Sequence, residues 1–335
     1  MKLSGINYHR HVSTESNPEN LQVIKTVIDD LNKTDVIALF PSLSIGEDRI
    51  YFLRDKTPTL LNSRIVLKTG YQSLLGRLGI PFRVVDNTPS WIEIPLVNGK
   101  ITWMAQCSAQ QNVTIRMINN EIRAVLSNSY TAIDDKEIIN LMERLFLPQI
   151  REIQFTCSSS DSNTRILTRE QFEAECNGYT TSMFLYISNS EIGDASVRCG
   201  IGMTIQNTDR TLSFQFVRDT RTLGRVIHRG EAIKRLEKEV TNLFAKTSDN
   251  WNLIQNALRT MSNVTVDQIP TLEQKMIKTL ESMPEFKVWK TQYDEIRKTT
   301  VVHNMFDLIY VMSSIPYKDE SFNNVVEEIV FGRFF

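Results

Sequence analysis

The pattern of apolar and polar positions changes along the chain. Up to about residue 217, apolar residues fall mostly in short alternating runs that Gly, Pro, Asn and Asp separate, as in antiparallel sheets. After Gly230 they recur every three or four residues, as on the buried face of a helix. The pattern predicts an α+β protein: an antiparallel sheet with helical insertions over residues 1–220, then a helical C-terminal region over residues 221–335.

Two helices in the first part have clear start signals. Asn17 precedes Pro18, which combines a capping side chain with proline at the first helical position. Asp134 and Glu137 fit a capping box, and the apolar stripe that follows ends before Pro148. In the last third, helical spacing predicts further helices around 233–244, 250–262, 271–282, 286–312 and 319–331.

Residues 113–126 allow one hairpin to be built in detail. Asn119 and Asn120 tolerate the positive φ of a two-residue turn, so strand 113–118 should pair with strand 121–126. One face is then wholly apolar, and the other places Arg116 directly opposite Arg123. Two like charges at this spacing are unfavourable unless an anion neutralises them. Either a carboxylate such as Glu121 does so, or a bound phosphate does.

A second hairpin is expected from strands 195–206 and 211–219 around the loop 207–210. Met203 and Ile205 should face Phe214 and Leu212 on a buried side. The opposite side carries Gly200 and Gly202, which leave a shallow floor. Either a neighbouring element packs against that floor, or a ligand approaches it.

Charge is balanced overall but segregated locally. The 335 residues include 38 Lys and Arg against 39 Asp and Glu, so no global basic excess attracts nucleic acid. However, residues 49–83 hold seven basic residues and one acid, and residues 210–246 hold nine basic residues and four acids. Such strips are either solvated faces or surfaces that track a phosphate backbone. The predicted nucleic-acid contacts are Arg116, Arg123, Arg221, Arg225, His228 and Arg229.

Aromatic residues lie near the first basic window. They would suit stacking with bases if they are exposed. We expect most of these aromatic residues to lie in the core. The residues that could stack with bases, if exposed, are Tyr51, Phe52, Tyr71, Phe82 and Trp91.

Little in the sequence points to an enzyme. The four cysteines lie far apart, and no glycine-rich phosphate loop, nucleophile elbow or zinc motif occurs, so we expect neither metal nor cofactor. Glu191 follows an apolar run, where metal-dependent nucleases place carboxylates, which keeps a nuclease as an alternative. No apolar run is long enough to cross a bilayer, and no signal peptide is evident, so a cytosolic protein is expected.

Four segments also resemble a known family. RAVLSNSYTAIDDKEII at 123–139 and ISNSEIGDASVRCGIGM at 187–203 are similar to signatures of phage and plasmid-like proteins that carry domain of unknown function 932. LLGRLGIPFRVV at 74–85 and VIHRG at 226–230 resemble two further segments of that family. Cys199 is followed by Gly200-Ile201-Gly202 where the family commonly has Cys-x-Asn-Gly. The matched positions are Arg123, Ser127, Tyr130, Asp134, Asn189, Ser190, Glu191, Gly193, His228 and Arg229.

The resemblance implies a phage or plasmid protein acting in the host cytoplasm, and it supplies no reaction. Ser127, Tyr130, Asn189, Ser190 and Glu191 therefore have no assigned role. Together with the basic strips, it leads us to expect nucleic-acid binding, to single-stranded DNA in replication or recombination. The first alternative is a homo-oligomeric assembly protein whose terminal aromatic residues, Phe331, Phe334 and Phe335, dock on a neighbouring copy.

Overall fold

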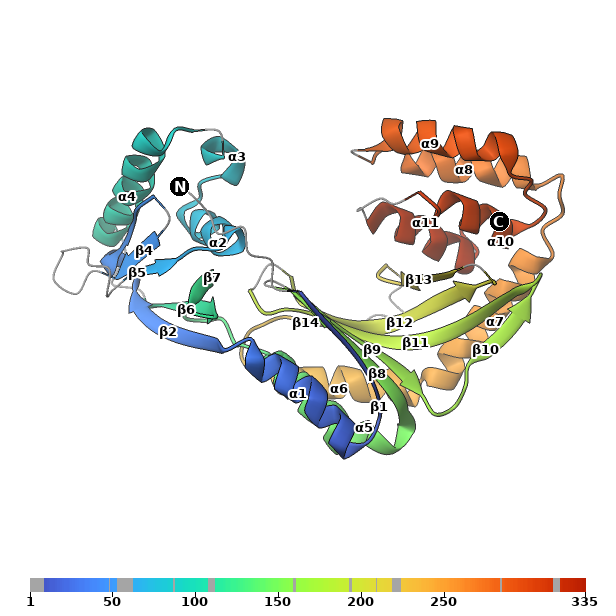
Figure 1. The fold of residues 1–335 in the computed structure, drawn as a ribbon, viewed down its shortest axis with the longest axis horizontal. Helices are drawn as coiled ribbons and strands as arrows, with labels where there is room; N and C mark the ends of the chain where they lie inside the picture. The colour runs from blue at the N-terminus through green and yellow to red at the C-terminus, as the bar shows by residue number, and fades with distance from the viewer. Residues whose placement is uncertain are drawn as a thin grey trace. The chain divides into compact units, whose positions relative to one another are not determined.

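The predicted α+β class is confirmed by the computed structural model, which combines antiparallel sheets with a helical C-terminal region (Figure 1). The structure describes residues 9–47, 49–52, 63–86, 88–107, 112–158, 161–192, 195–208, 210–218, 224–283, 285–315 and 320–335. The chain forms two compact units. Unit 1 comprises Met1–Thr164, Ser188–Val197 and Val226–Glu237, and unit 2 comprises Arg165–Ile187, Arg198–Arg225 and Lys238–Phe335.

These units do not follow the boundary that the sequence placed at residue 220. The chain passes from one unit to the other within five elements: β9 (Asp161–Thr168), β11 (Tyr179–Ser190), β12 (Val197–Gln206), β14 (Gly224–Val226) and the helix α6 (Ala232–Ala245). A hydrophobic period reports which type of element forms, but not which core that element joins. The change from sheet to helix was therefore visible in the sequence, whereas the interleaving was not.

Unit 1 is built from the N-terminal strands and helices. Its remaining elements are β1 (Arg10–Glu15), α1 (Pro18–Asp30), β2 (Lys33–Leu39), the 3₁₀ helix η1 (Phe40–Ser42), β3 (Leu43–Ile45), β4 (Arg49–Phe52), β5 (Ser63–Ile65), α2 (Lys68–Leu78), α3 (Phe82–Val85), α4 (Ser90–Cys107), β6 (Asn112–Ile118), β7 (Glu121–Ser127), α5 (Asp135–Phe146), the 3₁₀ helix η3 (Leu147–Gln149) and β8 (Ile150–Cys157). The expected helix starts are confirmed. The Asn17 side chain accepts from the Asn20 amide at 2.8 Å, and Glu137 accepts from the Asp134 amide at 3.0 Å.

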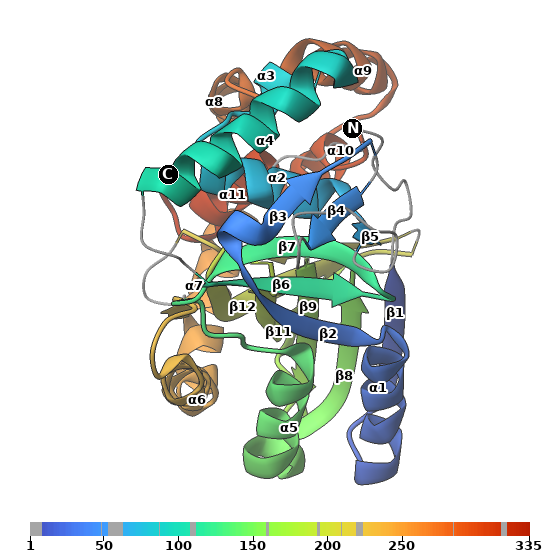
Figure 2. The ribbon, with the colours of Figure 1, turned by 90° about the vertical axis from the view of Figure 1, so that its left-hand side faces the viewer.

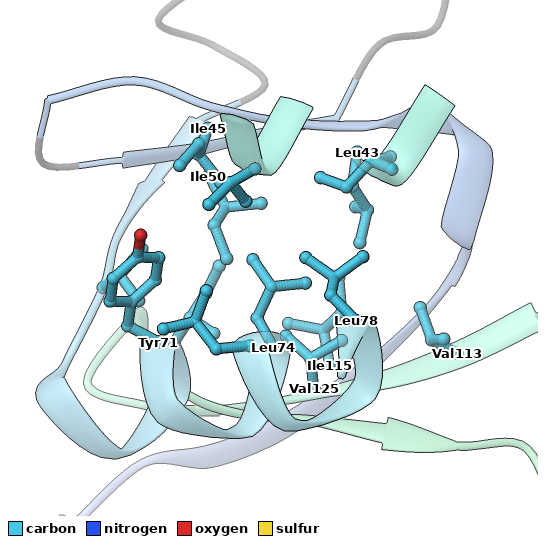
Figure 3. Close-up of a cluster of buried hydrophobic side chains, with 14 of the residues drawn as sticks. Leu43, Ile45, Ile50, Tyr71, Leu74, Leu78, Val113, Ile115 and Val125 are labelled. Atoms are coloured by element: carbon cyan, nitrogen blue, oxygen red, sulfur yellow. The ribbon is translucent and has the colours of Figure 1, made fainter. Parts of the chain in front are cut away.

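The core of unit 1 lies between α2 and two small sheets. β2, β6 and β7 form one three-stranded sheet in that order, and β3, β4 and β5 form the other. α2 approaches β7 so closely that a Cβ on Gly70 would overlap the carbonyl oxygen of Ile122. Figure 3 shows apolar side chains of this core, among them Leu43, Ile45, Ile50, Tyr71, Leu74, Leu78, Val113, Ile115 and Val125.

Unit 2 holds the second predicted hairpin and the C-terminal helices. Its further elements are β10 (Glu173–Cys176), β12 (Val197–Gln206), β13 (Thr211–Gln215), β14 (Gly224–Val226), α7 (Thr247–Ser262), α8 (Ile269–Leu280), α9 (Phe286–Thr299), α10 (Met305–Met312) and α11 (Glu320–Val330). α11 packs on β13, and α7 packs on β10. The helix expected over 286–312 is two helices, because Asn304 caps α10 by accepting from the Asp307 amide at 2.9 Å.

The register of the second hairpin is as predicted, with Met203 opposite Phe214 and Ile205 opposite Leu212. A Cβ on Gly202 would overlap the ring of Phe184 and would lie 2.5 Å from the Phe214 carbonyl oxygen. At Gly202, a neighbouring element therefore packs against the glycine, which was one of the two alternatives that the sequence left open.

Gly202→Ala should destabilise the protein by about 1–3 kcal/mol, because the added methyl group forces Phe184 out of its place. The matched control is Gly76→Ala on α2, where nothing lies within 4 Å of the added Cβ. There alanine should stabilise the helix by about 0.5–1 kcal/mol. Urea unfolding followed by circular dichroism measures both changes, and equal unfolding midpoints for the two variants would contradict this packing.

Candidate functional site

Many of the residues singled out in the sequence meet at one place in unit 1. Arg123 lies on β7, Tyr130 follows that strand, and Asp134 and Asp135 begin α5. Asn189 and Glu191 lie at and just beyond the end of β11, and His228 follows β14. We call the group of Lys33, Asp35, Arg116, Arg123, Asp134, Asp135 and Glu191 the charge cluster.

Glu191 is the centre of the charge cluster, with 2% of its side chain exposed. Its Oε2 accepts from Arg123 at 2.6 Å and from Lys33 Nζ at 2.8 Å, while its Oε1 accepts from the Asp135 amide at 2.9 Å. Burial alone would raise the pKa of this carboxyl, but the positive charges of Arg123 and Lys33 lower it to about 2. Glu191 is therefore ionised throughout the physiological range.

Asp135 is the second buried carboxylate. Lys33 Nζ lies 2.6 Å from its Oδ2, the amide group of Asn189 donates to its Oδ1 at 3.0 Å, and Ser162 donates to the same oxygen. Burial and the nearby charge of Glu191 raise the pKa of Asp135, and Lys33 opposes that shift. One lysine thus bridges two carboxylates that would otherwise repel each other.

Arg116 is bound on every side. Its Nε donates to Asp35 at 2.9 Å, one terminal nitrogen donates to the Glu191 carbonyl at 2.9 Å, and the other pairs with Asp134. Burial tends to lower the pKa of Arg116, but the surrounding carboxylates raise it further above its ordinary value. Arg116 and Arg123 have side chains only 2% and 1% exposed. Both guanidinium groups are therefore buried and paired with carboxylates, so the structure lends no support to the predicted phosphate contacts at these two positions.

The predicted opposition of the two arginines is wrong. The turn is as expected, because Asn119 and Asn120 have φ of 46° and 66° and Met117 pairs with Ile122. A β-bulge then intervenes, so that Arg116 pairs with Ala124. A bulge adds one residue to one strand and changes which side chains share a face. Val125 consequently joins the core with Ile115, while Ala124 and Leu126 pack with Ile192.

Tyr130 and His228 form a stacked pair beside the charge cluster. Their ring centroids are 4.9 Å apart at an interplanar angle of 15°, and the Tyr130 hydroxyl donates to the Glu191 carbonyl at 3.0 Å. His228 is 5% exposed, and burial lowers its pKa, which favours the neutral ring. The predicted phosphate contact of His228 stays a prediction that burial of the ring does not favour.

The remaining predicted contacts lie elsewhere. Arg225 and Arg229 are exposed, whereas Arg221, like Gly193, lies outside the described residues. Ser127 is partly exposed, and its hydroxyl lies 3.0 Å from that of Ser129. The phosphate contacts predicted at Arg225, Arg229 and Arg221 stay predictions.

Two alternative functions lose the residues on which they rested. Both carboxylate oxygens of Glu191 are engaged, and no group of His, Cys, Asp or Glu within the described ranges could hold a metal ion. In unit 2, the Phe331 ring packs 5.3 Å from Phe216, and Phe334 is 9% exposed, which leaves Phe335 as the exposed terminal aromatic at 47%. A nuclease site at Glu191 and a docking tail at 331–335 therefore draw no support from these contacts, and both stay predictions.

The sequence offered Trp91 as a stacking residue if it is exposed, but it did not indicate the rest of an apolar surface on α4. Trp91 is 75% exposed and Trp103 is 53% exposed, and Ile92 and Leu96 are exposed beside them. We call these four side chains the tryptophan face. Ile94, Val97, Ile101 and Met104 recur at helical spacing on the opposite side and pack into the core. The spacing of these four residues could have predicted the helix from the sequence. It could not have predicted that the opposite side of the helix is apolar and exposed.

Comparisons with known proteins do not assign the chain to a family. No protein-family model matches the chain, and no curated protein or solved structure is significantly similar to it. The resemblance to domain of unknown function 932 therefore stays a prediction. Within the described part of the chain, no helix combines the length and the apolar character that crossing a membrane requires.

Glu191→Gln should destabilise the protein by about 3–5 kcal/mol, because it leaves the buried Arg123 without its carboxylate partner and leaves Lys33 with Asp135 alone. The control is Asp29→Asn, which removes an exposed ion pair with Lys136 at 2.9 Å and should cost about 0–1 kcal/mol. Urea unfolding measures both. Similar losses in the two variants would show that the charge cluster does not hold unit 1 together.

The contribution of Glu191 should also depend on pH. Its pKa is lowered in the folded state, so its stabilising effect is complete above the unfolded value of about 4.3 and disappears as the pH falls towards 2. The difference in unfolding free energy between the wild type and Glu191→Gln should therefore be largest near pH 7 and should decrease below about pH 4. A difference that grows on acidification would refute this assignment.

Proposed function

We propose that the chain binds single-stranded nucleic acid through the tryptophan face. The observation that carries the proposal is the exposure of Trp91, which at 75% is the most exposed large apolar side chain among the described residues. Exposing an indole to water is unfavourable, and an unpaired base provides a flat partner of matching size. Trp103 offers a second stacking platform on the same helix.

The charges around the tryptophan face support this partner. Residues 63–107 hold five basic residues and two acids, and one of the acids, Glu93, is 3% exposed and accepts a hydrogen bond from Tyr71. Lys100 Nζ lies 4.0 Å from the centroid of the Trp103 ring, and Arg83 on α3 is exposed. Sites for single strands combine aromatic platforms with cations that follow the backbone in this way.

A single strand fits the tryptophan face better than a duplex does. Trp91 and Trp103 offer flat surfaces, and only unpaired bases expose their own faces for stacking. Arg116 and Arg123 are buried, so the sheet of β2, β6 and β7 does not present these two guanidinium groups to the phosphates of a duplex. The proposal includes a role in replication or recombination of a phage or plasmid in the host cytoplasm, in keeping with the resemblance, and it includes no catalytic step.

Replacing Trp91 and Trp103 with alanine should weaken binding of a fluorescein-labelled oligothymidine by about 5- to 150-fold for each residue, since stacking contributes about 1–3 kcal/mol per base. Fluorescence anisotropy measures the affinity. Val266→Ala removes a side chain that is 61% exposed in unit 2 and serves as the control with unchanged affinity. Wild-type protein that does not bind, or tryptophan variants that bind as well as the control, would refute the proposal.

The dependence of affinity on salt concentration distinguishes the contribution of phosphate contacts from that of base stacking. Affinity should fall as sodium chloride rises from about 50 to 200 mM, and Arg83→Ala should reduce that dependence. Arg229→Ala tests the second basic strip with the same oligonucleotide. A loss of affinity in Arg229→Ala, together with unchanged affinity in the tryptophan variants, would place the binding surface on that strip and contradict the role of α4.

A homo-oligomeric assembly protein remains our second proposal. Its predicted docking tail is packed within unit 2, but the exposed strand β2 favours self-association by a different surface.

A further inference from the structure

β2 is an edge strand that is well formed on its inner side. It pairs antiparallel with β6 through seven consecutive residues, from Lys33 opposite Ile118 to Leu39 opposite Asn112, without a register shift. In the part of the chain that the structure describes, the order of this sheet ends at β2 (Figure 2). Most of its residues are exposed, as expected for a strand whose second edge is uncovered.

The usual protection of a strand edge is missing from β2. Natural edge strands carry charged side chains, proline or bulges that prevent pairing with another chain. The two charged residues of β2 both have partners in the charge cluster: Lys33 contacts Glu191 and Asp135, and Asp35, which stays 37% exposed, contacts Arg116. Residues 33–39 contain no proline, and their pairing with β6 has no bulge.

Apolar side chains remain on the exposed part of the strand. Ile37 is 68% exposed and Leu39 is 43% exposed, and both lie on the same side of β2 as Lys33 and Asp35. Val36, on the other side, is 39% exposed. Association through this edge would cover apolar surface on both sides of the sheet.

We propose that β2 pairs antiparallel with β2 of a second copy of this chain, about a two-fold axis at Val36. This register pairs all seven residues of each strand, because residues 33 and 39 then lie opposite each other. It brings no like charges together, since Lys33 faces Leu39 of the second copy and Asp35 faces Ile37. Pairing hides both edges and closes at two copies, as an isologous interface does. The two three-stranded sheets would join into one.

Light scattering after size exclusion tests the assembly in the absence of nucleic acid, so its outcome is independent of the proposed binding function. The wild type should have twice the mass of one chain, and Ile37→Lys should have the mass of one chain, because each paired edge would gain a buried charge. Val23→Lys, at a position 51% exposed on α1, makes the same chemical change away from β2 and should remain a dimer. A monomeric wild type, or a dimeric Ile37→Lys, would overturn the proposal.

Hydrogen exchange then locates the interface. Backbone amides of residues 33–39 should exchange more slowly at high protein concentration than at low concentration, and Ile37→Lys should abolish that difference. Exchange in this segment that does not change with concentration, or a wild-type mass above two copies, would show that the chains associate elsewhere.

Discussion

The ion pair between Arg123 and Glu191 is the contact on which unit 1 depends. It joins β7 to the segment after β11, although the two residues are 68 positions apart in the chain. Lys33 extends the pair to Asp135, and so adds β2 and the start of α5. Burying charges costs several kcal/mol per ion, which only close pairing and further hydrogen bonds offset. The cluster therefore permits one arrangement of these segments and penalises any that leaves a charge unpaired.

The same cluster determines what remains on the outside of unit 1. It removes Arg116 and Arg123 from the surface, where they would otherwise attract polyanions, and it pairs the two charged residues of β2, Lys33 and Asp35, with groups of unit 1. The exterior of unit 1 also carries exposed apolar groups, among them Ile37 on β2 and Trp91 on α4. Both of our proposals for partners follow from these groups, because an exposed apolar group is stabilised by whatever covers it.

Local signals in the sequence predicted local structure well. The turn at Asn119 and Asn120, the helix start at Asn17 and the pairing of Met203 with Phe214 all depend on a few neighbouring residues, and each is confirmed. The bulge next to Arg116 depends on tertiary contacts, since it lets both arginines reach Glu191 from neighbouring strands. Counting along a hairpin does not reveal it. The exposure of Trp91 was likewise hidden, because α4 is apolar on both sides and such a helix is normally buried.

The segments that resemble the phage and plasmid family contribute mainly to the interior. Arg123, Asp134 and Glu191 lie in the charge cluster, and Tyr130 and His228 stack beside it. In a sequence these residue types look like an active site, because buried polar groups and catalytic groups use the same chemistry. Here the charges of Arg123, Asp134 and Glu191 are each paired within unit 1. These residues therefore connect segments that lie far apart in the sequence. These positions therefore account for the packing of unit 1, whereas our proposals for partners rest on the exposed surfaces of α4 and β2.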